Sequence, residues 1–210
     1  MSKTKDQTDA IELLKSDHEK VKGLFEQFED AESQEEKESI IQQAIEELKV
    51  HAQIEEEIFY PALRGEVEDD LMNEADEEHH VARILIAELD MNEEEDEAHR
   101  NAKFTVLAES VKHHIKEEEG ELMPQAKKAE IDFQALGTRL MERKNQLQES
   151  GVPDDDEHQM ISSFANGSGS SESRSGNSRT ASSERTTVAG SSSTKSKSSR
   201  KAAPRQKRSA

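Results

Sequence analysis

The sequence contains no cysteine and no tryptophan among its 210 residues, and its apolar residues do not gather into long runs. Without cysteine, the chain cannot form disulfides, zinc sites with thiolate ligands or a cysteine nucleophile. No apolar run approaches the length of a membrane span, and the first residues, Met1 to Lys5, do not lead into the apolar segment of a signal peptide. We therefore expect a cytoplasmic protein with no membrane partner.

The formal net charge of −19 is unevenly distributed along the chain. Residues 162–210 hold ten Lys and Arg but only two acidic residues, which leaves 18 basic and 45 acidic residues, a net charge of −27, in residues 1–161. A body this acidic repels nucleic acid and anionic membranes. We therefore expect no nucleic-acid partner, apart from weak contact through the basic tail, and the sequence leaves any protein partner unknown.

The composition changes near residue 150. After the turn-forming segment 151–156, Ser, Gly, Thr, Lys and Arg dominate, and such a composition cannot build an apolar core. The basic residues from Lys195 to Arg208 have no aromatic residues between them, so a solubilising tether explains this tail at least as well as nucleic-acid binding does. The sequence predicts a folded domain over residues 1–150 and a disordered, Ser-rich basic tail over residues 151–210.

One motif occurs twice in the acidic body. In each copy a His is followed four residues later by a Glu and ten residues later by a Pro: His51, Glu55 and Pro61, then His114, Glu118 and Pro124. Residues four apart lie on the same face of a helix. Each copy therefore offers an imidazole and a carboxylate to one point beside its helix.

Five stretches show the spacing of apolar residues that is typical of an amphipathic helix, approximately residues 6–31, 33–62, 69–91, 94–119 and 132–148. On each of the first four, the apolar residues form a row along one helical face, called the apolar seam below, and polar residues interrupt this row. They are His18, His51, Glu55, His79, His114 and Glu118. The neighbours His80 and His113 lie about 100° off these seams, as does Glu117, so we expect them to face away.

The first two helices and the next two resemble each other. Asp17 and His18 align with Glu78 and His79, followed by apolar residues at the same positions, and the later His and Glu follow in the same order. The chain thus carries two copies of one helical hairpin. We predict an all-α protein: an up-down-up-down four-helix bundle with an accessory C-terminal helix.

The two seam glutamates suggest a metal site, because an ionised carboxylate is almost never buried without a partner. A pair of metal ions bridged by Glu55 and Glu118 would balance the charge, and the four seam His would supply nitrogen ligands, which favour iron, zinc, copper or nickel. A single His in an apolar seam is more often a core residue, so the hypothesis depends on all six residues. Neither the zinc-protease motif, excluded by Ala52, nor the ferritin-like Glu-x-x-His pattern fits.

The pattern as a whole resembles the hemerythrin-like HHE cation-binding family, on the residues Asp17 to Glu19, His51 to Pro61, Glu78 to His80 and His114 to Pro124. The resemblance implies a centre of two non-haem iron ions with an oxo or hydroxo bridge. It places His18 and His51 nearer one iron and His79 and His114 nearer the other, with Glu55 and Glu118 bridging.

The sequence departs from the oxygen-carrying members of that family, since Arg83 stands where they have a fifth His. The resemblance implies a protein that binds iron and oxygen or a related small ligand, such as peroxide or nitric oxide, for sensing, storage or stress protection. The alternatives are a di-iron redox enzyme and a structural bundle that binds adventitious metal. Near the site, Glu56 and Glu119 are expected to face solvent rather than to bond a ligand His, and Tyr60 to pack at the end of its helix.

Overall fold

The computed structural model describes residues 9–91, 96–153 and 159, and within these ranges it is all-helical, without β-strands. Four long helices account for most of the described residues: α1 (Ala10–Asp30), α2 (Gln34–Ile54), α4 (Asp69–Met91) and α5 (Glu97–Glu117). Among the described helices, none combines the length and the apolar character that crossing a membrane requires. The predicted tail lies outside the described residues, except for its first residues and Gln159.

Side-chain caps fix where the helices begin. Ser33 accepts a hydrogen bond from the backbone N–H of Glu36, as its position in the sequence predicted. Two other starts differ from the prediction. Asp9 caps α1, so that helix begins at Ala10 rather than near residue 6, and Asp96 caps α5, which begins at Glu97 rather than near residue 94. In both places the capping residue has a non-helical ψ angle, 141° at Asp9 and 129° at Asp96, which ends the helix on its N-terminal side.

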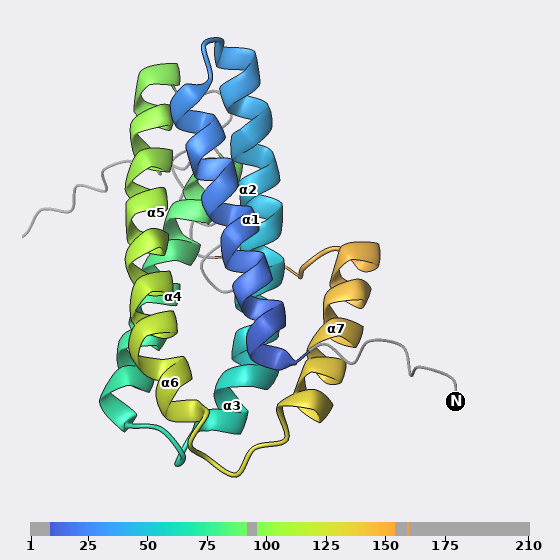
Figure 1. Cartoon of the computed structure of the whole chain (residues 1–210). Helices are drawn as coiled ribbons and strands as arrows, with labels where there is room; N and C mark the ends of the chain where they lie inside the picture. The colour runs from blue at the N-terminus through green and yellow to red at the C-terminus, as the bar shows by residue number, and fades with distance from the viewer. Residues whose placement is uncertain (1–8, 92–95, 154–158, 160–210) are drawn as a thin grey trace, which may run out of the picture. The chain divides into compact units, whose positions relative to one another are not determined.

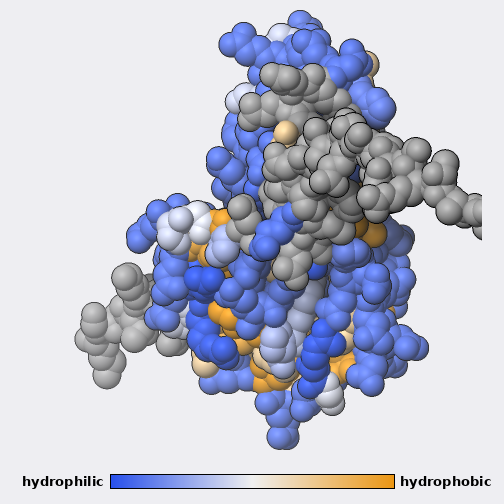
Figure 2. Space-filling view, turned by 180° about the vertical axis from the view of Figure 1, so that it is seen from behind, coloured by the Kyte–Doolittle hydropathy of each residue, from blue (hydrophilic) through white to orange (hydrophobic). Residues whose placement is uncertain are grey.

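The four long helices lie side by side (Figure 1). Helix α1 contacts α2, and α4 contacts α5, so each predicted hairpin is present. The hairpins meet through contacts of α2 with α4 and α5 and of α1 with α5. Figure 2, seen from behind, shows hydrophilic residues over most of the coloured surface, as the acidic composition requires.

Two apolar clusters fill the space between the helices. One is built around Phe25, Phe28 and Phe104, and the other around Phe59 and Leu63. On α1 and α4 a buried His separates the residues of one cluster from those of the other, and near His51 and His114 the chain likewise passes from one cluster to the other. The clusters therefore exclude water from both sides of a single polar layer, and that layer holds the candidate site.

Two π-helical turns interrupt the helices that carry the repeated motif, at Glu55–Phe59 and Glu118–Leu122. Each turn is followed by a short helix, α3 (Tyr60–Leu63) or α6 (Met123–Ala126), with Pro61 or Pro124 in its first turn. A proline ring collides with the carbonyl four residues earlier in a regular α-helix, and the wider turn accommodates it. The second helix was predicted to end near residue 62, and the helical chain does end at Leu63, but nothing in the sequence indicated the π-helical turn within it. The fourth helix was predicted to end near residue 119, whereas the chain stays helical through the second π-helical turn to Ala126.

Helix α7 (Phe133–Ser150) matches the predicted accessory helix. It packs against α1, α2 and the first π-helical turn, and Figure 1 shows it beside that hairpin. Its buried face consists of Leu136, Leu140 and Leu147, with Gly137. This helix therefore covers one flank of the first hairpin. Among the described elements, none packs in the same way on the second hairpin.

Candidate metal centre

The four predicted His come together in the polar layer, one from each long helix. His18, His51, His79 and His114 are each at most 7% exposed. Their Nε2 atoms face one another in pairs: His18 and His51 are 3.1 Å apart, and His79 and His114 are 3.2 Å apart. Four imidazole nitrogens thus converge on one small volume.

Glu55 and Glu118 stand beside these imidazoles, each at the first position of a π-helical turn. An Oε2 atom of Glu55 lies 3.2 Å from Nε2 of His51 and 3.4 Å from Nε2 of His79, so it touches both pairs. Oε2 of Glu118 lies 3.2 Å from Nε2 of His18. Ligand atoms of His18, His51 and Glu55, and likewise of Glu55, His79 and His114, lie within 4.8 Å of one another. All six predicted residues are therefore brought together.

The two carboxylates are buried without donors. Glu55 is 0% and Glu118 is 2% exposed, and among the described residues none donates a correctly oriented hydrogen bond to any of their four oxygens. Burial and the neighbouring Glu118 raise the pKa of Glu55 well above its usual value. Burial also acts to raise the pKa of Glu118, but the nearby His18 and His114 lower it to about 2. Buried carboxylates that accept no hydrogen bond, together with imidazole nitrogens, are suitable ligands for a metal ion that binds both oxygen and nitrogen.

Each candidate His also faces a carboxylate with its other ring nitrogen. Nδ1 of His18 lies 3.0 Å from Glu119, Nδ1 of His79 2.9 Å from Glu56, and Nδ1 of His114 2.8 Å from Glu78. Nδ1 of His51 lies farther, 3.8 Å, from Asp17. Such partners fix the ring orientation and leave Nε2 free for metal. The expectation that Glu56 and Glu119 face solvent was wrong, because the wider turn after Glu55 and Glu118 swings the next residue towards the opposite helix.

Three of these outer carboxylates are themselves bound by cations. Arg83 forms an ion pair with Glu56, Lys15 lies 3.1 Å from Glu119, and Lys144 of α7 forms an ion pair with Asp17. Arg83, which stands where the oxygen carriers have a fifth His, thus supports a candidate ligand through Glu56. Sequence reasoning missed Lys144, since no periodicity relates α7 to the site. Asp17 and Glu78 did have a signal, because they precede His18 and His79 at equivalent positions of the repeat.

Tyr60 was expected to pack at a helix end, but its hydroxyl enters the polar layer. The hydroxyl oxygen lies 3.1 Å from Nε2 of His79 and 3.4 Å from Nε2 of His114. The residue is 1% exposed, and burial, with the nearby Glu55 and Glu118, raises the pKa of the phenol well above its usual value. The equivalent position in the second hairpin is Met123, so only one side of the layer has a phenol.

The side of each helix that faces inwards (the helix phase) is the one that the sequence predicted. His79 is buried and His80 exposed, and His114 is buried whereas His113 is exposed. Glu118 is buried, and Glu117 is only partly so, paired with His113 at 3.3 Å. Burial lowers the pKa of His51 to about 4, more than the nearby Asp17 raises it. This imidazole is therefore neutral at physiological pH, which is the form that binds metal.

A cavity of about 30 Å³ adjoins the imidazoles. All four candidate His form part of its wall, with Glu78, Arg83 and Ser110 as the other polar members, and the remaining lining is apolar. This volume is about two to three times the ~10–15 Å³ that one water molecule needs, so only a very small ligand fits beside the centre.

The chain matches a known protein family. The family described as hemerythrin, hemerythrin HHE cation binding domain, matches residues 9–126, a range that contains α1 to α6 and all six candidate residues. Helix α7, with Lys144, lies beyond the matched range. No curated protein and no solved structure matches the chain.

Proposed function

Because the chain belongs to the hemerythrin HHE cation-binding family, we propose that it is a non-haem di-iron protein that binds oxygen or a related small ligand. His18, His51, His79 and His114 would hold two iron ions, bridged by Glu55 and Glu118, inside an up-down-up-down four-helix bundle. Such a protein would serve sensing, storage or protection against oxidative stress. Two bound iron ions would supply one-electron chemistry and open coordination positions.

The observation that carries the proposal is the sharing of Glu55. This one carboxylate lies within coordination reach of two separate His pairs, and its oxygens lack donors among the described residues. A single ion would leave one pair and one carboxylate uncompensated in an environment that excludes water, which is costly. Two ions with a shared carboxylate satisfy the whole set. The nitrogen-rich set favours iron over magnesium or calcium.

The cavity supports a ligand of two or three atoms. Its apolar lining would accept a neutral gas molecule, and its position against His51, His79 and His114 would bring that molecule to the centre. The outer carboxylates hold the imidazoles in place, so the protein contributes orientation and exclusion of water.

Metal analysis tests this proposal. The full chain, purified from iron-replete cells, should contain close to two iron ions, and fewer than one per chain would refute the di-iron centre. Mixing the reduced protein with oxygen should then give a spectrum that reverses when oxygen is removed. Rapid oxidation without a reversible spectrum would refute oxygen binding.

The position of Tyr60 favours a second candidate function, a redox enzyme that decomposes peroxide or handles nitric oxide. A buried hydroxyl 3.1 Å from Nε2 of His79 could hold or deliver a proton beside a bound ligand. Comparing the wild-type chain with Tyr60→Phe in stopped-flow mixing with peroxide separates the two. Turnover that depends on the hydroxyl, at unchanged iron content, supports the enzyme.

A further inference from the structure

Glu78 faces the candidate centre and the surface at once. Its Oε2 lies 2.8 Å from Nδ1 of His114, and its Oε1 lies 3.7 Å from Nε2 of His113. The same Nε2 lies 3.3 Å from Oε1 of Glu117. Ligand atoms of Glu78, His113 and Glu117 lie within 4.8 Å of one another, and the His113 side chain is 56% exposed. These residues, called the outer site below, therefore form a cluster of metal-ligand types that is open to solvent.

A small cavity links the outer site to the centre. It has a volume of about 10 Å³, and its polar lining consists of Glu74, Glu78, His114, Glu117 and Glu118. Of these, Glu118 is 2% exposed, and neither of its oxygens accepts a hydrogen bond among the described residues. The volume approaches that needed by one water molecule, and is therefore sufficient for one small ion. A buried, unsatisfied carboxylate thus faces the same space as the surface carboxylates.

The duplication of the hairpin shows that this arrangement exists on one side only. In the alignment that pairs His18 with His79 and His51 with His114, the positions of Glu74, His113 and Glu117 correspond to Leu13, Val50 and Ile54. Those three apolar residues are buried in the cluster that also contains Leu136, Leu140 and Leu147 of α7.

On the first hairpin, the carboxylate equivalent to Glu78 is Asp17, and Lys144 of α7 already binds it. The flank under α7 is thus closed by apolar residues and by a cation. Solvent exposure alone would explain polar residues on the uncovered flank. It does not explain why Glu74, His113 and Glu117, which replace the three apolar residues of the first hairpin, all have side chains that can bind metal. Nor does it explain why all three line or adjoin a cavity that leads to Glu118.

We propose that Glu78, His113 and Glu117 form an outer site for a divalent cation, through which ferrous ions reach the buried centre, with Glu74 and Glu118 lining the path. This inference rests on the proposed di-iron function. The negative charge of Glu74, Glu78 and Glu117 raises the local concentration of cations at the mouth of the cavity. His113 adds a nitrogen ligand that prefers iron to the more abundant magnesium and calcium.

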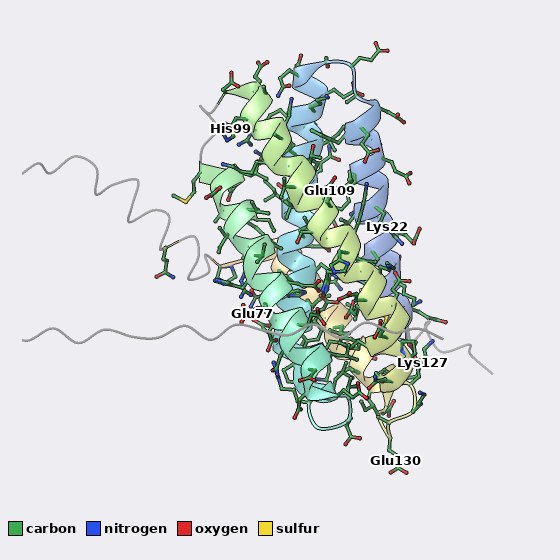
Figure 3. The ribbon with its side chains drawn as sticks, turned by 90° about the vertical axis from the view of Figure 1, so that its left-hand side faces the viewer. Lys22, Glu77, His99, Glu109, Lys127 and Glu130 are labelled. Atoms are coloured by element: carbon green, nitrogen blue, oxygen red, sulfur yellow. The ribbon has the colours of Figure 1, made fainter. Side chains whose placement is uncertain are left out.

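The test measures how fast the metal-free full chain takes up ferrous ions without oxygen. The fraction of iron protected from a ferrous chelator is followed over time for the wild type, for His113→Ala with Glu117→Gln, and for the control His99→Ala with Glu130→Gln. The two control residues, His99 and Glu130, are exposed, and Figure 3 shows them at opposite ends of the helices. The control substitutions remove one carboxylate charge and one imidazole, as the outer-site substitutions do, so a general electrostatic effect would appear in both double variants.

The outer-site variant should load about tenfold or more slowly and reach the iron content of the wild type, while the control loads normally. Loading at the wild-type rate would overturn the outer site, and so would a lowered final iron content, since the residues would then belong to the centre itself. A wild-type chain that holds no iron would instead refute the proposed function.

A second measurement tests, without iron, whether the outer site binds a divalent cation. After the centre is filled with two equivalents of Zn²⁺, which binds nitrogen ligands more tightly than Mn²⁺ does, electron paramagnetic resonance follows added Mn²⁺. The wild type and the control should bind one Mn²⁺ more than His113→Ala with Glu117→Gln binds. Equal Mn²⁺ binding by all three chains would overturn the outer site.

Discussion

The Nδ1 atom of His79 lies 2.9 Å from Oε1 of Glu56, a residue that directly follows the candidate ligand Glu55. The hydrogen bond ties α4 to the π-helical turn that ends α2. Its counterpart joins His18 on α1 to Glu119, which follows Glu118. Each turn therefore contributes two carboxylates, one towards the centre and one behind an imidazole of the opposite helix.

Replacing Glu56 by Ala should weaken iron binding by about 10- to 100-fold, because His79 loses the acceptor that orients its ring. Competition with a chelator of known affinity measures this change. Glu57→Ala is the matched control, since Glu57 is exposed and pairs with Arg143 on the surface. Equal iron affinities for the two variants would contradict the role of Glu56.

The helix phase predicts opposite outcomes for neighbouring histidines. His79→Ala should lower the iron content, because a buried candidate ligand is lost, whereas His80→Ala should leave it unchanged. His114→Ala and His113→Ala should differ in the same way in final iron content. Iron is measured per chain after purification. Loss of iron from the His80 or His113 variant alone would show that the helix phase is wrong.

Replacing Glu55 by Gln should have opposite effects on the metal-free and the iron-loaded protein. Without metal, a buried carboxylate that lacks donors is exchanged for a neutral amide, so the free energy of unfolding should rise, on the order of 1–3 kcal/mol. With iron, the same change removes the carboxylate shared by both His pairs, and the two-iron state should be lost. Thermal unfolding with and without iron measures both, with Glu57→Gln as the control. A metal-free variant less stable than the wild type would refute the argument.

Lys144→Met tests whether α7 supports the centre. Without its cation, Asp17 should turn towards solvent and hold His51 less firmly, so that one of two iron ions binds about tenfold more weakly. Mössbauer spectra should then show a change in one iron environment only. Arg143→Met, next to it on α7, removes the surface pair with Glu57 and should leave both environments unchanged. Identical spectra for Lys144→Met and the wild type would rule out this role.

The hydrophobic periodicity predicted the helical class, the two hairpins and the burial of His79, His114 and Glu118 over their neighbours. These predictions succeeded because each concerns one helix, where the angular position of a residue follows from its place in the sequence. The starts of α1 and α5 were missed by a few residues, because Asp9 and Asp96 end the helices through their own side chains.

The sequence by itself therefore determined which six residues face inwards and in what order, since the repeat places them on four helical seams. Only the tertiary structure decided what stands behind them. Glu56, Glu119 and Tyr60 meet the candidate His ligands across helices, and Lys144 meets Asp17, at distances set by the two π-helical turns and by the packing of α7. Such contacts depend on the path of the backbone between elements far apart in sequence, and one helix's periodicity carries no information about that path.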